Sequence, residues 1–256
     1  MNSVYHPSGN EVEIFEHCYK NKLPLLLKGP TGCGKSQLVQ YMAERLNQEL
    51  IKVACNEDTN SADLLGRFLI RGAETVWQDG PVSRAARSGT ILYLDEIAEA
   101  REDVMVALHP LTDHRREIYL DRINEVIQAS ERFMCVASYN PGYQRGFREL
   151  KSSTRQRFVH VALSYLNVSQ EAALISELTQ LAPSESMQLA QVAARIRGLD
   201  EYNLKETVST RLLVYAATLI KAGMNSRKAC HASLAEALSD DREIVTAIKD
   251  LIDLSL

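Results

Sequence analysis

The chain has 256 residues, of which 45% are hydrophobic and 24% are charged, as in an ordinary soluble protein of one large or two small domains. Its formal net charge of −4 argues against a dominant nucleic-acid surface, which is usually basic. The five cysteines form no C-x-x-C pair, and neither a signal-peptide pattern nor a membrane-length apolar run occurs, so we expect a reduced cytoplasmic protein.

The first predicted element is a helix over residues 10–19. For the irregular segment before it two alternatives stay open: Tyr5 or His6 contacts the adenine of a nucleotide, or the segment is a surface arm with a buried aromatic residue. The apolar run at 23–27 predicts a buried strand. Apolar residues at helical spacing follow from Gln37 onward, so a glycine-rich loop connects a strand to a helix.

That loop reads G-x-x-x-x-G-K-S, the phosphate-binding P-loop. Glycines let several backbone N–H groups turn toward one anion, and the N-terminus of the following helix favours negative charge. We expect Lys35 to reach the β- and γ-phosphates of ATP and Ser36 to ligate Mg²⁺. The predicted nucleotide-binding residues are Gly29, Pro30, Thr31, Gly32, Cys33, Gly34, Lys35 and Ser36.

A strand at 50–54 and a short helix near 63–66 come next, followed by a hairpin of about 66–79. The hairpin carries Phe68 and Trp77, and two alternatives stay open: it projects toward a partner, or it packs onto the core. Gly80-Pro81 begins a helix that ends at Gly89.

The apolar strand at 90–94 ends in Asp95-Glu96. Carboxylates at the carboxyl end of a buried parallel strand lie where open α/β sheets bind ligands. We expect Asp95 to hold the Mg²⁺ shell and Glu96 to orient or deprotonate the attacking water. An acidic pair that only stabilises a helix N-terminus is the alternative, and the P-loop upstream argues against it.

A helix over 102–108 precedes His109, Asp113 and His114, whose spacing fits no standard zinc site. A second hairpin of about 114–130 follows. The buried strand at 133–138 leads to Asn140, which we expect to hydrogen-bond the γ-phosphate or the attacking water, although a plain turn role suits the Asn-Pro-Gly sequence as well.

Arg155 and Arg157 precede the strand at 158–163. An arginine there suits a finger offered to a neighbouring subunit, because such a cation neutralises transition-state charge. From residue 167 onward only helices are predicted, at 171–181, 185–197, 211–222, 227–238 and 242–254. Arg211 falls in a first helical turn, where a cation opposes the helix dipole, and this points to a ligand contact.

Together these blocks resemble an AAA+ ATPase of the MoxR branch, and within it the NirQ/NorQ/CbbQ proteins, the CbbQ type above all. The resemblance spans about residues 20–165 and is carried by the P-loop and by residues 63–67, 79–81, 93–96, 109–116, 138–144 and 153–158. It implies an α/β core of residues 1–166, with a five-stranded parallel sheet between helices, and a small all-α lid of residues 167–256.

The resemblance also implies a hexameric ring that uses ATP and Mg²⁺ to remodel a client enzyme with a von Willebrand factor A partner like CbbO. CbbQ implies Rubisco as client, freed of inhibitory sugar phosphates, whereas NorQ implies nitric oxide reductase. A nucleic-acid motor is the alternative from a different class. By position, Asn140 matches sensor 1, Arg211 matches sensor 2 of the lid, and Arg155 or Arg157 matches the finger. Residues 120–125 depart from the Lys-Gly-Glu hairpin tip expected in the family.

Overall fold

The computed structural model describes residues 3–141, 150–199 and 207–256. The chain forms two compact units. Unit 1 contains Met1–Gly29 and Lys35–Ala162, and unit 2 contains Pro30–Gly34 and Leu163–Leu256. The division after Ala162 lies near the predicted boundary after residue 166, whereas Pro30–Gly34, predicted to belong to the core, group with unit 2. Residues 142–144, the end of one block that carries the family resemblance, lie outside the described residues.

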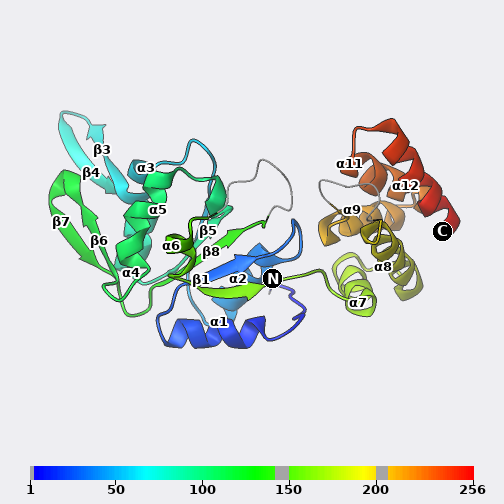
Figure 1. Ribbon diagram of the computed structural model, residues 1–256, viewed down its shortest axis with the longest axis horizontal. Helices are drawn as coiled ribbons and strands as arrows, with labels where there is room; N and C mark the ends of the chain where they lie inside the picture. Colours follow the sequence, from blue (N-terminus) through cyan, green and yellow to red (C-terminus); the bar gives the residue numbers. More distant parts are fainter. Residues whose placement is uncertain (1–2, 142–149, 200–206) are drawn as a thin grey trace. The chain divides into compact units, whose positions relative to one another are not determined.

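A five-stranded sheet forms the centre of unit 1, with strand order β2-β5-β8-β1-β9 (Figure 1). All neighbouring strands are parallel. The apolar runs account for the central strands, since β1, β5 and β8 are buried almost throughout. The predicted α/β class is therefore confirmed. The strands are β1 (Leu25–Lys28), β2 (Leu50–Ala54), β5 (Ile91–Asp95), β8 (Met134–Tyr139) and β9 (Val159–Ala162).

Helices cover both faces of this sheet (Figure 1). On one face, Leu26 and Leu92 share an apolar core with Val82 of α4 and Val104 of α5. Helices α1 and α2 lie on the opposite face. The helices of unit 1 are α1 (Glu11–Lys20), α2 (Lys35–Arg45), α3 (Ser61–Leu65), α4 (Pro81–Ser88), α5 (Glu102–Leu108) and α6 (Ser152–Arg155), with the 3-10 turns η1 (Ile97–Glu99) and η2 (His109–Leu111).

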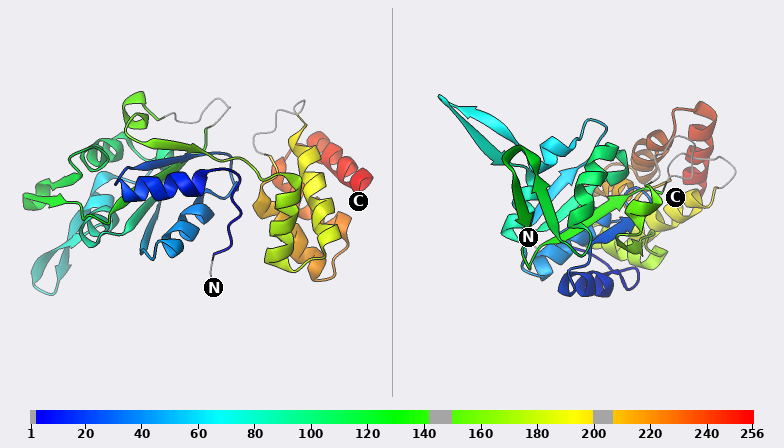
Figure 2. Two further views of the ribbon diagram at one scale, coloured as in Figure 1. Left: turned by 90° about the horizontal axis from the view of Figure 1, so that it is seen from below. Right: turned by 60° about the vertical axis from the view of Figure 1, so that its left-hand side comes forward.

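Two antiparallel hairpins extend from unit 1 (Figure 2). The first pairs β3 (Gly66–Arg71) with β4 (Glu74–Asp79), and the second pairs β6 (Glu117–Leu120) with β7 (Glu125–Gln128) through the turn η3 (Asp121–Ile123). Trp77 packs against the core at the base of the first hairpin, whereas Ile70 near its tip is 81% exposed. The packing alternative therefore holds at the base of this hairpin, whereas a partner contact of its exposed tip stays a prediction.

Arg87 of α4 joins the two hairpins. Its Nε lies 2.8 Å from Asp79 Oδ2 of the first hairpin, and its Nη1 lies 2.7 Å from Glu125 Oε1 of the second. The hydrogen bond from Arg87 lowers the pKa of Glu125. Gly80, which precedes α4, approaches the backbone of α3 so closely that a Cβ would lie 2.3 Å from the Leu64 carbonyl oxygen. The Asp79-Gly80-Pro81 sequence thus joins the first hairpin closely to α3 and α4, and Arg87 links both hairpins to α4.

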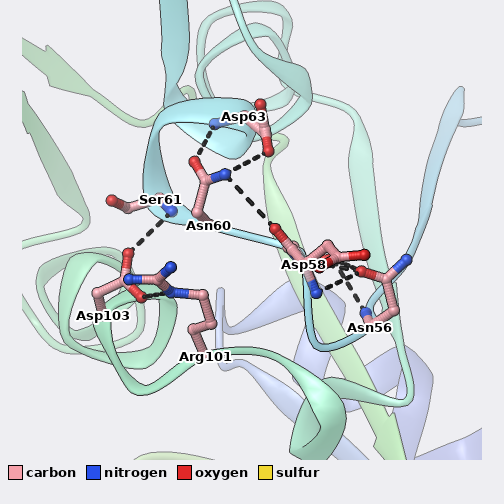
Figure 3. Close-up of polar contacts among 8 residues, drawn as sticks. Asn56, Asp58, Asn60, Ser61, Asp63, Arg101 and Asp103 are labelled. Carbon is pink, nitrogen blue, oxygen red and sulfur yellow. Dashed lines mark hydrogen bonds and ion pairs between the residues drawn. The ribbon is translucent and has the colours of Figure 1, made fainter.

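The loop between β2 and α3 is held by its own polar contacts (Figure 3). Asn60 caps α3, because its side chain accepts a hydrogen bond from the Asp63 N–H at 3.1 Å. The Ser61 N–H donates to Asp103 Oδ2 of α5 at 3.2 Å. These contacts satisfy backbone donors and tie the loop to the helix that follows the Asp95-Glu96 strand.

From Leu163 onward, the described residues of unit 2 form helices and no strand, and they have an apolar core of their own. The predicted helix at 227–238 is interrupted, because its middle turn is π-helical. No helix among the described residues has both the length and the apolar character that crossing a membrane requires. The elements are α7 (Val168–Thr179), α8 (Pro183–Arg197), α9 (Thr210–Lys221), α10 (Ser226–Cys230), the π turn η5 (His231–Ala235), α11 (Glu236–Leu238) and α12 (Arg242–Ser255).

Candidate nucleotide-binding and hydrolysis site

The P-loop connects β1 to α2, as its sequence predicts. Gly32 and Gly34 adopt φ values of +70° and +97°, a region that residues with a side chain rarely occupy. Within unit 2, Gly32 lies against Ser209 at the start of α9, where a Cβ would come within 2.5 Å of Ser209 Cβ. The loop therefore requires glycine at position 32 for both its backbone conformation and its packing.

Lys35 begins α2, and its side chain turns back along the loop. Its Nζ donates to the Gly29 carbonyl oxygen at 2.8 Å and to Asn140 Oδ1 at 2.5 Å. Only 6% of the residue is exposed. The structure thus places this ammonium between the start of the P-loop and the residue that follows β8, two segments that are far apart in the sequence.

Glu96 lies directly after β5 and faces the same amide. Asn140 Nδ2 donates to Glu96 Oε1 at 2.8 Å. Burial raises the pKa of Glu96 above its ordinary value, the Lys35 charge opposes this shift, and the Asp95 charge adds to it. The Glu96 backbone is left-handed, with φ +53°, a strain of about 1–2 kcal/mol for a residue with a side chain. A carboxylate with a raised pKa can accept a proton from water.

Asp95, the last residue of β5, faces Ser36. Its Oδ2 lies 3.4 Å from Ser36 Oγ. Its other oxygen, Oδ1, accepts hydrogen bonds from the Tyr93 hydroxyl at 2.7 Å and from Ser138 Oγ at 2.5 Å. One hydroxyl and one carboxylate oxygen on adjacent elements are the hard oxygen ligands that Mg²⁺ prefers, so these residues fit the ion.

Sequence reasoning missed Tyr93 and Ser138. The available signal was that each interrupts an apolar strand with a hydroxyl group, in Ile91–Asp95 and Met134–Tyr139. A separate zinc-type site finds no support, because no group of three His, Cys, Asp or Glu side chains suited to a metal occurs in the described part of the chain.

Arg155 and Arg157 do not belong to this cluster within one chain. They precede β9, whose first residue, Val159, pairs with Leu25, the first residue of β1. The P-loop follows the carboxyl end of β1, so the two arginines lie near the amino ends of the strands and the P-loop lies at their carboxyl ends. Arg155 is exposed, whereas Arg157 is partly buried and its Nη1 donates to the Ser153 carbonyl at 2.6 Å.

The other two predicted contacts are placed as follows. Arg211 is exposed in the first turn of α9, whose N-cap is Ser209. Tyr5 donates its hydroxyl to Glu11 Oε1 at 2.8 Å, and its ring lies 5.7 Å from that of Tyr41. Tyr5 is half-buried and contacts the protein itself, while a contact of Tyr5 or His6 with adenine stays a prediction.

Known proteins match nearly the whole chain. The AAA domain of the dynein-related subfamily matches residues 24–158, and the CbbQ/NirQ/NorQ C-terminal family matches residues 171–255. Denitrification regulatory protein NirQ of Pseudomonas aeruginosa is 51% identical over 98% of this chain and 96% of its own. Protein NorQ of Paracoccus denitrificans is 50% identical, and protein CbbQ of Hydrogenophilus thermoluteolus is 47% identical, each over 96% of this chain and 92% of its own.

A solved structure of a protein assigned as an ATPase from Cytophaga hutchinsonii shares the fold. The TM-score is 0.55 at 16% identity, over 94% of this chain and 80% of that one. The P-loop site, the two family matches over both parts of the chain and the near full-length relatives agree with one another. The chain therefore belongs to the CbbQ/NirQ/NorQ family of AAA ATPases.

Proposed function

We propose that this protein is the motor of a hexameric ring in the cytoplasm, and that it uses ATP hydrolysis to remodel a client enzyme together with a von Willebrand factor A partner like CbbO. The observation that carries the proposal is the separation within one protomer between the hydrolytic groups and the arginines before β9. A site that is split in this way is completed by a neighbouring copy.

Within one protomer, residues 29–36 bind the phosphates of ATP, and Ser36 and Asp95 hold Mg²⁺, partly through water. The ion supplies charge neutralisation at the phosphates. Glu96 takes a proton from the attacking water, while Asn140, which already contacts both Lys35 and Glu96, orients that water or the γ-phosphate.

The neighbouring protomer supplies Arg155 or Arg157 to the γ-phosphate. Exposure favours Arg155, because a finger acting on another subunit must reach out of its own. Arg157 has a buried Nε without a hydrogen-bond partner among the described residues, so the position of its side chain leaves one hydrogen-bond donor unsatisfied. Arg211 at the start of α9 serves as the contact of the helical lid with the nucleotide.

The two hairpins transmit the motion to the partner or the client. The first hairpin exposes Phe68 and Ile70, at 45% and 81%, and the second exposes Tyr119 and Val126, at 51% and 55%. Exposed apolar groups on projecting strands are typical of interaction surfaces. The Arg87 bridges to both hairpins let a displacement of α4 move them together.

Rubisco is the first client to test. Nitric oxide reductase is the second candidate, and the 51% identity to a denitrification regulatory protein and the 50% identity to NorQ favour it. The 47% identity to CbbQ over a similar share of the chain supports the first client.

The proposal is tested by reconstitution. Rubisco blocked by a sugar phosphate, or nitric oxide reductase lacking its iron, is incubated with this protein, the von Willebrand factor A partner and ATP, and recovery of client activity is measured. We expect recovery of one client, none with Glu96→Gln, and a larger loss of recovery than of ATP hydrolysis with Ile70→Ser. If neither client recovers and DNA stimulates hydrolysis instead, the remodelling proposal is wrong and the nucleic-acid motor is supported.

A further inference from the structure

Tyr93 is a tyrosine in the middle of an aliphatic strand, and it is 1% exposed. It lies two residues before Asp95 on β5, so both side chains project from the same face of the sheet. Its hydroxyl donates to Asp95 Oδ1 at 2.7 Å and lies 3.4 Å from Ser36 Oγ. A buried phenol therefore touches both predicted Mg²⁺ ligands.

Ser138 supplies a second hydroxyl from the neighbouring strand. Leu94 pairs with Ala137 in the parallel register of β5 and β8, which places Ser138 next to Asp95. Ser138 is fully buried, and its Oγ donates to Asp95 Oδ1 at 2.5 Å. The Glu96 N–H donates to the same Oγ at 3.3 Å, which leaves the serine proton for the carboxylate.

The two hydroxyls act on one oxygen of the carboxylate. Oδ1 accepts both hydrogen bonds, while Oδ2 lies 3.4 Å from Ser36 Oγ. Rotation of the Asp95 carboxylate would break two charge-assisted hydrogen bonds in a buried place, where they are strongest.

We infer that Tyr93 and Ser138 are positioning residues, which hold Asp95 Oδ1 so that Oδ2 faces the Mg²⁺ position beside Ser36. The inference rests on the proposed metal role of Ser36 and Asp95 and deepens it. The two hydroxyls touch the carboxylate rather than the ion, and they act by orienting it. A tyrosine that only fills the core would affect stability and leave the metal requirement unchanged.

Tyr93→Phe tests this, because phenylalanine keeps the buried ring and removes only the hydroxyl. Binding of a fluorescent ATP analogue is titrated at a series of free Mg²⁺ concentrations and also in EDTA, with thermal unfolding measured alongside. We expect wild-type binding in EDTA and a rise in the Mg²⁺ concentration for half-maximal binding on the order of 10- to 100-fold, the usual effect of losing a group that orients a ligand.

Ser138→Ala should shift the Mg²⁺ requirement in the same direction. The double variant should shift it by a factor different from the product of the two, because both hydroxyls act on one oxygen. Tyr41→Phe is the matched control: it removes a hydroxyl that accepts a hydrogen bond from Arg45 Nη1 at 3.2 Å, outside the site. It should leave the Mg²⁺ requirement at the wild-type value.

A Tyr93→Phe protein that folds and keeps the wild-type Mg²⁺ requirement would overturn the inference. Equal weakening of binding with and without Mg²⁺ would also overturn it, since that indicates a purely structural role. Asp95→Asn separates this failure from failure of the proposed site. If Asp95→Asn changes the Mg²⁺ requirement and Tyr93→Phe does not, only the positioning role is wrong; if Asp95→Asn has no effect, the metal assignment itself is wrong.

Discussion

Replacing Arg197 with methionine removes the positive half of a buried ion pair in unit 2. The Glu171 side chain is 1% exposed and that of Arg197 is 14% exposed. Two guanidinium nitrogens donate to the two carboxylate oxygens at 2.7 and 2.8 Å, and Thr210 Oγ1 donates to Glu171 Oε1 at 2.6 Å. In the variant, the threonine is the only one of these donors left to a buried negative charge.

The expected loss follows from that geometry. Removing one partner of a buried ion pair lowers the free energy of unfolding by about 3–5 kcal/mol. Arg197 also donates Nε to the Val208 carbonyl at 2.8 Å, and its guanidinium lies 4.0 Å from the centre of the Tyr165 ring. The stacking contributes about 1 kcal/mol more. Partial exposure of the arginine and the remaining Thr210 bond both reduce the total, so we expect a loss of about 3–4 kcal/mol.

The single tryptophan makes the two units distinguishable in a urea titration. Fluorescence of Trp77 reports unit 1, while far-ultraviolet circular dichroism is weighted toward the helices of unit 2. Arg197→Met should move the circular dichroism transition to lower urea and leave the fluorescence transition nearly in place. The control Arg195→Met lies on the same helix, is exposed, and loses one hydrogen bond to Ser255 Oγ, so it should change stability by no more than about 0.5 kcal/mol.

A double variant decides whether the uncompensated charge is the cause. When Glu171→Met accompanies Arg197→Met, two flexible apolar side chains replace the ion pair, and such replacements are often neutral or stabilising. We expect most of the lost stability to return. The reasoning is refuted if the double variant is as unstable as Arg197→Met alone, or if Arg197→Met loses no more stability than Arg195→Met.

Two further predictions concern turnover. Burial raises the pKa of Glu96 above its ordinary value of 4.5, and its basic form is lost as the pH falls through this raised pKa, so the acidic limb of the ATPase pH profile should lie above pH 4.5. Glu96→Gln should bind ATP without turnover. A Glu96→Gln protein with wild-type hydrolysis contradicts this. Lys35→Ala is mixed with a finger variant, either Arg155→Ala or Arg157→Ala. One mixture should regain up to about a quarter of wild-type ATPase, because about a quarter of the interfaces in randomly mixed rings join an intact Lys35 to an intact finger arginine. If neither mixture gains activity over its components, the proposal that a neighbouring protomer supplies the arginine is wrong.

Much of this architecture could be predicted because its signals are local. The P-loop, the strand before it and the helix after it are contiguous in sequence, and the buried strands are apolar runs. The one-turn helix α6 was not predicted, because four residues carry no helical periodicity. The π turn within the predicted 227–238 helix was missed for a related reason: the spacing of apolar residues does not distinguish an α-helical turn from a single wider turn.

The contacts of Asp95 could not be predicted, because they depend on the register between β5 and β8, which no local pattern encodes. Polar residues in buried strands also differ in what they indicate. Thr90, just before β5, has a buried Oγ1 without a hydrogen-bond partner among the described residues, whereas the Tyr93 hydroxyl contacts a serine and a carboxylate. A buried hydroxyl group loses its hydrogen bonds to water, and of these two residues it is Tyr93 at which the protein replaces them with a charged acceptor. The Tyr93 hydroxyl makes β5 less apolar than an aliphatic strand. In the proposed metal site, the same hydroxyl orients the Asp95 carboxylate.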